Sequence, residues 1–298
     1  PRLSIGAGHR KIKFQFRRVP HKFARSQRRR LRKRRAPVIM IHMTDERIYV
    51  GFLSGNILKI IACIAMLIDH IGWILLPELT VLRMIGRISM PLFAFTFGEG
   101  CFYTRSKAKH FVLVFAMGVI TSAAMSFAMG ELYGNILITF SMSCLIICAL
   151  DGLKRSAFAK DGKKAALCSV ALALSVALAA WVCCFSPFDI DYGIAGVTLP
   201  VCVRLFDFRS FGAQGLAASA YNLATVLLPF FVNLLALSLI YGAVQLFSLF
   251  SLIFILCYSG GRGRHKFKGL FYIFYPAHLA IIASVYLILN PGFLATLF

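Results

Sequence analysis

Long apolar stretches alternate with short polar segments along the chain after residue 55. Each stretch is close to the length of about 20 apolar residues that a helix needs to cross the hydrocarbon core of a bilayer. The pattern predicts an all-α, polytopic transmembrane helix bundle with about nine spans. These spans are expected at residues 56–76, 84–102, 110–129, 135–150, 165–186, 192–206, 215–234, 236–258 and 269–289. Because residues 215–258 are too long for one span, we expect a turn at Pro229 and Asn233.

The composition agrees with a membrane protein and excludes other classes. Hydrophobic residues make up 59% of the 298 residues, charged residues make up 15%, and the mean hydropathy is +0.78. Soluble domains are about half apolar and about a quarter charged. A soluble enzyme, a disordered protein and a nucleic-acid-binding domain are therefore excluded as the main body of the chain.

Lysine and arginine are concentrated in every second loop of the expected bundle. Short loops rich in these residues remain on the cytoplasmic side of a membrane. The loop after the second span contains Arg105, Lys107 and Lys109, and the loop after the fourth contains Lys154, Arg155, Lys160, Lys163 and Lys164. The loop after the sixth span contains Arg204 and Arg209, and the loop after the eighth contains Arg262, Arg264, Lys266 and Lys268. The loops between them hold Glu78, Glu131 and Asp189 and almost no basic residue. We therefore expect a bacterial plasma (inner, cytoplasmic) membrane protein with its N-terminus inside and its C-terminus outside.

A strongly basic tail precedes the apolar body. Residues 1–36 contain 15 of the 33 Lys and Arg residues and no acidic residue, whereas the whole chain has a net charge of +22. Such a tail can bind anionic lipid headgroups or nucleic acid. Because Met40 directly precedes the apolar body, we favour the alternative that residues 1–39 are a start-site extension or a disordered segment. The membrane body, residues 40–298, is expected to bind lipid and no nucleic acid.

The sequence lacks the motifs of several common enzyme classes. It contains no P-loop, no G-x-G-x-x-G before a βαβ unit, no H-E-x-x-H and no G-x-S-x-G. Its nine cysteines form no C-x-x-C pair, and most lie within apolar runs, where they are expected to act as small packing residues. No metal is therefore expected.

Ionisable residues inside the expected spans are candidate site residues, because each costs about 3 kcal/mol or more in hydrocarbon. Asp69 and His70 are consecutive in the outer part of the first span, and Lys59 lies three helical turns before His70 on the same face. A carboxylate near an imidazole can raise its basicity and set its tautomer. Neighbouring helical residues point in different directions, however, so Arg87 is an alternative partner for Asp69.

The second expected span contains further charges. Arg83 and Arg87 share one face near the outer end, and Gly86 between them allows close helix approach. Pro91 is expected to bend this helix. Glu99 lies near the cytoplasmic end, about 18 Å along the axis from Arg87, so these two residues are not expected to pair.

Later segments add polar candidates with supporting roles. Asp191 begins the sixth span from outside and is a candidate partner for an outer arginine. His278 falls near the midplane of the last span. The full supporting set is Glu99, Asn135, Asp191, Tyr192, Tyr275 and His278.

These residue types fit two kinds of chemistry. A neutral histidine can take a proton from an amine or hydroxyl acceptor, and an arginine can hold a phosphate or a developing oxyanion. The same buried charges would suit a proton-coupled transporter. The residues by themselves leave both readings open.

Four motifs resemble the TraX family. They are K-x-I-A-x-x-x-M-x-x-D-H from Lys59 to His70, L-R-x-x-G-R-x-x-x-P-L-F-A-F-x-x-x-E-G from Leu82 to Gly100, D-Y-G-x-x-G-V from Asp191 to Val197, and F-Y-x-F-Y-P-x-H-L from Phe271 to Leu279. The resemblance covers roughly residues 55–290. The family is also similar, more distantly, to integral-membrane acyltransferases.

The resemblance implies an acetyl-CoA-dependent N-acetyltransferase that acetylates the N-terminal amine of processed pilin in conjugation. It implies that His70 is the base, with Asp69 supporting it or ordering an arginine. Arg87 and Arg83 would contact the acyl donor or the oxyanion, together with Lys59. Acetyl-CoA and pilin are the expected partners besides lipid, and no metal is implied.

Two other functions remain open at this point. A secondary transporter or exporter could use Asp69, Glu99 and His70 as a proton relay, although the sequence shows no inverted repeat. A scaffold in a conjugation complex would leave the buried Asp69–His70 pair without a purpose.

Overall fold

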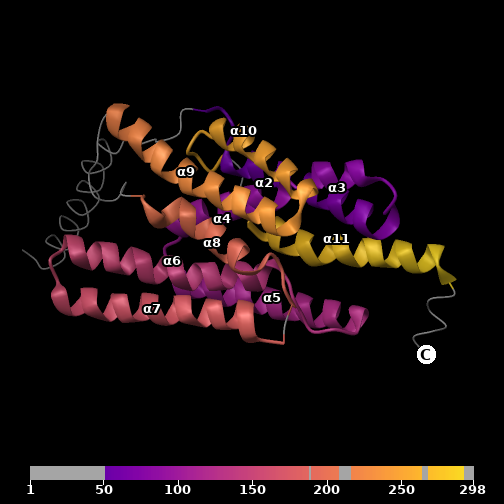
Figure 1. Cartoon of the computed structure of the whole chain (residues 1–298), viewed down its shortest axis with the longest axis horizontal. Helices are drawn as coiled ribbons and strands as arrows, with labels where there is room; N and C mark the ends of the chain where they lie inside the picture. The colour runs from indigo at the N-terminus through magenta and orange to yellow at the C-terminus, as the bar shows by residue number, and fades with distance from the viewer. Residues whose placement is uncertain (1–50, 188, 208–215, 264–267, 292–298) are drawn as a thin grey trace, which may run out of the picture. The chain divides into compact units, whose positions relative to one another are not determined.

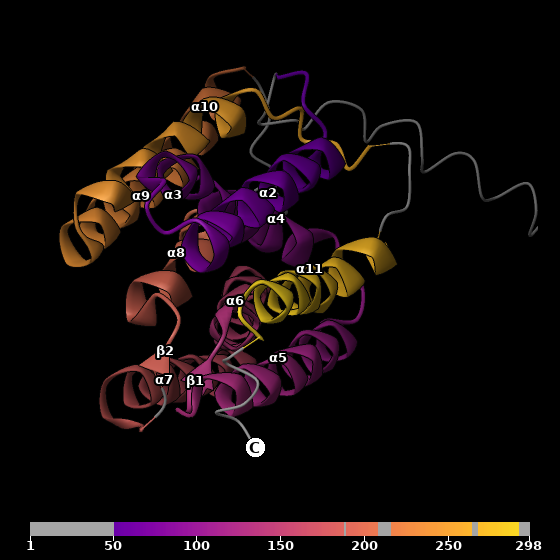
Figure 2. The same cartoon turned by 90° about the vertical axis from the view of Figure 1, so that its right-hand side faces the viewer.

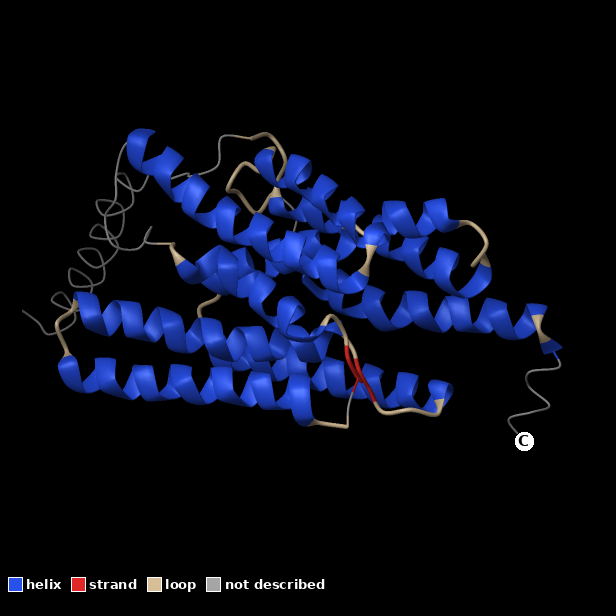
Figure 3. Ribbon diagram, viewed as in Figure 1, coloured by secondary structure: helices blue, strands red, loops and turns tan. Residues whose placement is uncertain are grey.

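The computed structural model describes residues 51–187, 189–207, 216–263 and 268–291. The basic tail at 1–39 and the expected start near Met40 lie outside the described residues. The described part is almost entirely helical, which confirms the predicted all-α class (Figure 3). Its elements are α2 (Gly55–His70), η1 (Ile71–Leu75), α3 (Thr80–Gly86), α4 (Ser89–Tyr103), α5 (Lys107–Met129), β1 (Tyr133–Gly134), α6 (Ile136–Phe158), α7 (Gly162–Phe185), β2 (Asp189–Ile190), α8 (Gly193–Leu205), α9 (Leu216–Tyr241), η3 (Ala243–Phe250), α10 (Ser251–Leu256) and α11 (Lys268–Leu289).

Seven helices in the described part are long and apolar enough to cross a bilayer. The predicted spans 192–206 and 236–258 correspond to shorter apolar helices, at Gly193–Leu205 and Ala243–Leu256. A helix of 13 residues is about 20 Å long, whereas the hydrocarbon core is about 30 Å thick. The structure therefore confirms a bundle of membrane-length helices and leaves the number of nine spans unconfirmed.

The predicted turn at Pro229 and Asn233 is wrong. Helix α9 continues through both residues to Tyr241, and the chain turns at Gly242, which has a φ of 88°. A proline inside a helix removes one backbone hydrogen bond, which neighbouring helices in a membrane bundle can tolerate. A positive φ suits glycine because it has no Cβ. The boundary between these two segments is therefore set by Gly242.

The second predicted span is interrupted between α3 and α4, at Arg87 and Ile88. Pro91 explains the position of the break. Its ring has no N–H to donate to the carbonyl of Arg87 four residues earlier, and it clashes with that carbonyl in a regular helix. The structure thus confirms the predicted bend and places Arg87 directly at it.

The helices pack around two apolar clusters that share α8. In both views α5, α6 and α7 lie on one side, and α2, α3, α9 and α10 lie on the other (Figure 1 and Figure 2). Leu199 and Val203 of α8 belong to the cluster of Phe95 and Phe230, while Val197 belongs to the cluster of Ile147. Helix α8 therefore lies between the two helix groups and fixes the turn that precedes it.

A short parallel strand pair holds that turn. Tyr133 of β1 pairs with Asp189 of β2, and Gly134 pairs with Ile190 (Figure 3). The next residues along the chain, at 191–192, enter α8 from the strand pair. The pair therefore positions the aspartate and tyrosine of the D-Y-G motif.

Candidate functional site

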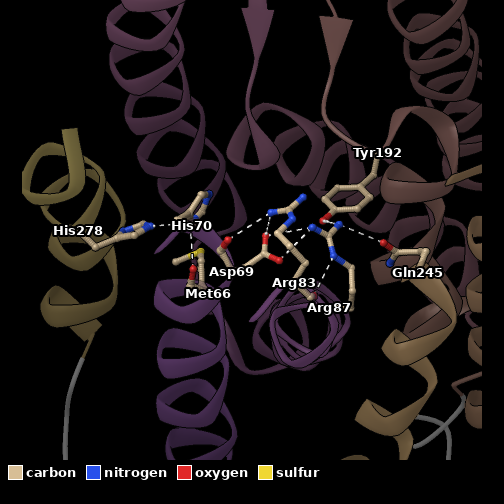
Figure 4. Close-up of polar contacts among 8 residues, drawn as sticks. All are labelled: Met66, Asp69, His70, Arg83, Arg87, Tyr192, Gln245 and His278. Carbon is tan, nitrogen blue, oxygen red and sulfur yellow. Dashed lines mark hydrogen bonds and ion pairs between the residues drawn. The ribbon is translucent and has the colours of Figure 1, made fainter. Parts of the chain in front are cut away.

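Asp69 forms ion pairs with two arginines from the neighbouring helix (Figure 4). Arg83 Nη1 donates to Asp69 Oδ2 at 2.8 Å. Arg87 Nη2 donates to Asp69 Oδ1 at 2.9 Å and to Oδ2 at 3.2 Å. Of the two partners that the sequence left open for the Asp69 carboxylate, His70 and Arg87, the structure shows Arg87, and Arg83 shares the same carboxylate. We call Asp69, His70, Arg83, Arg87 and His278 the Asp69–His70 site.

The two arginines differ in how many of their nitrogens are occupied. Arg87 also donates from Nη1 to Gln245 Oε1 at 3.2 Å and to the Tyr192 hydroxyl at 3.4 Å, and from Nε to the Arg83 carbonyl at 3.4 Å. Arg83 uses only Nη1, and its other two guanidinium nitrogens bond to no described residue. The Arg83 side chain is 27% exposed, against 12% for Arg87. Arg87 is thus committed to protein contacts, whereas Arg83 retains donors for another group.

Tyr192 reaches Arg87 from an unusual backbone conformation. It is the residue before α8 and has a φ of 59°, in the left-handed region that residues with a Cβ rarely adopt. The hydroxyl contact with Arg87 and the strand pair before it hold the residue in this conformation. Backbone conformations of this kind cluster at functional sites, which draws attention to the D-Y-G segment.

Asp191 lies beside the arginines without forming an ion pair with either among the described residues. Its carboxylate is hydrogen-bonded to the Tyr133 hydroxyl, and its backbone carbonyl accepts from Thr139 Oγ1 at 2.9 Å. The residue sits in the turn between β2 and α8, outside the membrane-length helices. Burial raises the pKa of the Asp191 carboxyl to about 7. The predicted ion pair of Asp191 with an outer arginine is not seen among the described residues; both arginines pair with Asp69 instead.

His70 is in contact with a second histidine. His278 Nε2 of α11 lies 3.1 Å from His70 Nδ1, although the two residues are 208 positions apart in the chain. His70 Nδ1 also lies 3.0 Å from the Met66 carbonyl oxygen, and His278 Nδ1 lies 2.8 Å from the Phe274 carbonyl oxygen. Figure 4 shows His278 of α11, His70 and Asp69 of α2, and the two arginines at the end of α3 following one another.

These contacts assign the tautomers of the two histidines. A carbonyl oxygen only accepts a hydrogen bond, so Nδ1 of each ring must carry the hydrogen. In the neutral pair, His278 Nε2 therefore accepts from His70 Nδ1, which it shares with the Met66 carbonyl. The remaining nitrogen of His70, Nε2, has no proton and bonds to no described residue. It is an available base.

Three predicted residues lie away from this site. Lys59 is about 16 Å along α2 from His70 and packs over the Phe271 ring at 5.4 Å. Glu99 is buried in α4, twelve positions beyond Arg87. Asn135 caps α6 by accepting from the Leu137 and Ile138 amides. Tyr275, by contrast, is buried next to His278, with ring centroids 5.7 Å apart.

Gln245 and Tyr133 were not predicted from the sequence as neighbours of the site. Gln245 is an uncharged polar residue inside the apolar run 236–258, and that position is the sequence signal that could have identified it. In the structure its side chain is buried in η3. A polar side chain in such a run must find a partner. Tyr133 gave no such signal, because its role depends on the pairing of β1 with β2.

A second ionic group, which the sequence did not predict, is formed by Lys107, Asp151, Lys154, Arg204 and Asp207; we call it the Arg204 cluster. Arg204 Nη2 lies 2.9 Å from Asp151 Oδ1, and Arg204 Nη1 pairs with Asp207. Lys107 Nζ lies 3.3 Å from Asp151 Oδ2, and Lys154 Nζ bonds to the Asp207 carbonyl at 3.2 Å. The cluster joins the ends of α6 and α8 to the start of α5. Among the described residues, no group of three or more His, Cys, Asp and Glu side chains could hold a metal ion.

Comparisons with known proteins agree with this architecture. The family model described as TraX protein matches residues 54–286. The uncharacterized protein RP591 of Rickettsia prowazekii is 39% identical over 88 residues, which cover 26% of this chain and only 35% of that relative. The probable fimbrial assembly protein FimC, serogroup H1, of Dichelobacter nodosus is 26% identical over 257 residues, covering 78% of this chain and 96% of that relative. No solved structure matches. With its membrane-length helices and a family match across nearly all of them, the chain is a multi-pass membrane protein that belongs to the TraX family.

Proposed function

We propose that this protein is an integral-membrane acetyltransferase that moves an acetyl group from acetyl-CoA to the N-terminal amine of pilin. The observation that carries the proposal is the contact of His70 Nδ1 with the Met66 carbonyl and His278 Nε2, which leaves Nε2 of His70 as the available base next to an arginine pair organised by Asp69. Membership of the TraX family and a relative named for fimbrial assembly support the pilin acceptor.

The proposed reaction assigns a separate task to each group. His70 Nε2 removes a proton from the acceptor amine as the nitrogen attacks the acetyl carbonyl carbon. The new C–N bond forms, the C–S bond of the thioester breaks, and the departing CoA thiolate receives the proton. Arg83 donates to the developing oxyanion through the guanidinium nitrogens that Asp69 does not occupy. Asp69 and Arg87 position Arg83 and do not touch the acyl group.

The location of the site also suggests how the two substrates meet. Asp69, His70 and Arg87 fall in the part of the bundle for which the loop charges predict an outer position in the inner membrane. A processed pilin presents its N-terminus on that side, and acetyl-CoA is made in the cytoplasm. The donor therefore enters from the cytoplasmic side and the acetyl group meets its acceptor in the outer half. A cysteine at position 70 that reagents reach only from the cytoplasm would contradict this path.

The transporter alternative receives less support from the arrangement of its residues. It requires Asp69, His70 and Glu99 to form a proton relay, yet Glu99 lies about 18 Å along the helix from Arg87. Asp69 is also occupied by two guanidiniums.

Transfer of radiolabel from acetyl-CoA tests the proposal. Membranes with wild-type protein, His70→Ala or His110→Gln at matched expression would be offered pilin and total envelope extract, with donor on both faces. His110 is a suitable control because it is another half-buried histidine, bonded at 3.3 Å to Tyr272 of α11, away from Asp69. We expect label in pilin with wild type and His110→Gln and none with His70→Ala. Label in another envelope component would identify that component as the acceptor in place of pilin. The absence of any His70-dependent label would favour the transporter alternative.

A further inference from the structure

We infer that His278 is a positioning residue that acts through His70, by accepting the Nδ1 proton of His70 when His70 takes the acceptor's proton at Nε2. This inference rests on the proposed acetyl transfer. The contact that carries it is the 3.1 Å approach of His278 Nε2 to His70 Nδ1.

The hydrogen bonds give this contact a direction. His278 Nδ1 is held as a donor by the Phe274 carbonyl at 2.8 Å, so its Nε2 has a lone pair that faces His70. The other acceptor near His70 Nδ1 is the Met66 carbonyl at 3.0 Å, and a backbone carbonyl does not take a proton at neutral pH. Of the two, only His278 can receive the proton.

Asp69 does not fill this role. In an Asp–His pair the carboxylate orients the imidazole and stabilises the imidazolium that forms. Here both carboxylate oxygens of Asp69 bond to Arg83 and Arg87, and no bond joins Asp69 to the His70 ring. The group that contacts His70 Nδ1 in place of a carboxylate is the His278 ring.

The surroundings of the two rings favour moving the positive charge from His70 to His278. His70 lies on the arginine side of the pair, whereas His278 lies on the side away from the guanidiniums (Figure 4). The two guanidiniums and the Asp69 carboxylate together carry a net positive charge, and its repulsion of a cation is stronger at the nearer ring. His278 is also stacked on Phe274, with centroids 4.9 Å apart and an angle of 10°, and it packs against Tyr275. Aromatic faces stabilise a cation beside them.

The proton steps balance without any additional reactant. As the amine attacks, its N–H bond breaks and an N–H bond forms at His70 Nε2. The N–H bond at His70 Nδ1 breaks, and one forms at His278 Nε2. His70 Nε2 then gives its proton to the CoA thiolate, and the proton on His278 returns to His70 Nδ1. The pair ends in the tautomers from which it started.

His278→Gln separates proton transfer from orientation. The glutamine carbonyl can accept a hydrogen bond from His70 Nδ1 but does not take the proton, so it preserves the contact without the relay. We expect kcat to fall by about tenfold or more, because positioned acid–base groups contribute roughly 10²–10⁴ to rates. KM for acetyl-CoA should stay within about twofold. His110→Gln is the matched control and should keep both constants.

A proton inventory in mixtures of H₂O and D₂O reports the number of protons that move. A plot of the wild-type rate against the fraction of D₂O should be curved, because two protons move together. The plot for His278→Gln should be linear, because only one proton moves. A His278→Gln variant with the wild-type rate and a curved plot overturns the inference while the acetyltransferase remains. If His278→Gln loses activity because it misfolds, its KM and unfolding temperature also change. The spectroscopic test below then decides the inference.

Nitrogen NMR of ¹⁵N-histidine-labelled protein in membranes provides a readout that does not depend on activity. The spectra of His70→Gln and His278→Gln would assign the two rings by difference. We expect both neutral rings to carry their hydrogen on Nδ1, with His278 Nε2 shifted as a hydrogen-bond acceptor. A hydrogen on His70 Nε2 overturns the relay even if acetyl transfer is found. Wild-type protein that transfers no acetyl group instead overturns the proposed function, and the catalytic role of the pair with it.

Discussion

Gly86 of α3 lies directly against Asp69 of α2, so closely that a methyl group on Gly86 would overlap the carboxylate. This approach allows one carboxylate to reach Arg83 and Arg87, which lie one helical turn apart on either side of the glycine. The glycine of the L-R-x-x-G-R motif therefore has a physical purpose, which is to let the charged groups of two helices meet.

Replacement of Gly86 by alanine should consequently separate Asp69 from the arginines. We expect His70-dependent transfer to fall roughly a hundredfold, as for other displacements of about 1 Å in an active site. The unfolding temperature in detergent should fall as well. Gly100→Ala is the matched control, because a Cβ at Gly100 in α4 would meet nothing within 4 Å. Equal activity and stability of the two variants would contradict the role of the close approach.

The two arginines should respond differently to substitution by glutamine. Arg83→Gln removes the donors proposed for the oxyanion, so we expect kcat to fall by about 10²–10³ with a small change in unfolding temperature. Arg87→Gln breaks contacts with Asp69, Tyr192 and Gln245 together, so it should lower the unfolding temperature more. Turnover measured beside thermal unfolding separates the two effects. The reverse order of stability losses would show that Arg83, not Arg87, holds the site together.

The Arg204 cluster should affect stability without affecting turnover of the folded protein. Arg204→Met leaves Asp207 and Asp151 buried with less counter-charge, which typically costs about 3–5 kcal/mol. Denaturant unfolding in detergent measures this loss. Lys164→Met is a useful comparison, because its ion pair with Asp161 is exposed and should contribute nothing measurable. A large loss of kcat in folded Arg204→Met would instead connect the cluster with catalysis.

Asp191 should make stability depend on pH. Its pKa is raised by burial to about 7, so the folded protein binds a proton more tightly than the unfolded chain does. Stability should therefore fall as the pH rises from about 4 to about 7, and should then level off. Asp191→Asn should remove this part of the dependence. The unfolding temperatures of wild type and variant, compared across this range, test the expectation; a constant difference would rule it out.

Hydrophobic pattern alone was sufficient to place most helices. Runs of about 20 apolar residues predicted the membrane-length helices, because hydrocarbon imposes that length on any spanning helix. The pairing of Asp69 with Arg87 could also be considered from the sequence, because a charge in the membrane needs a counter-charge and these two residues lie at the same depth.

Other features depend on packing that one sequence does not encode locally. The contact of His70 with His278 requires α2 and α11 to be neighbours, and helices of similar hydropathy give no sign of which ones meet. The turn was predicted at Pro229 because proline often ends a helix. The chain turns instead at Gly242, whose positive φ does not show in the sequence. Gln245 was overlooked because an uncharged amide needs no counter-charge, so the sequence does not indicate which residue it contacts.

The joining of α2 and α11 at the two histidines has a consequence for how the protein becomes active during synthesis. Helix α11 follows every other described element, so the ribosome makes it last. Until it inserts, His70 has no second histidine beside it, and the pair cannot form. A growing chain would therefore lack the proton acceptor of His70, and the proposed acetyl transfer would reach its full rate only after α11 has inserted.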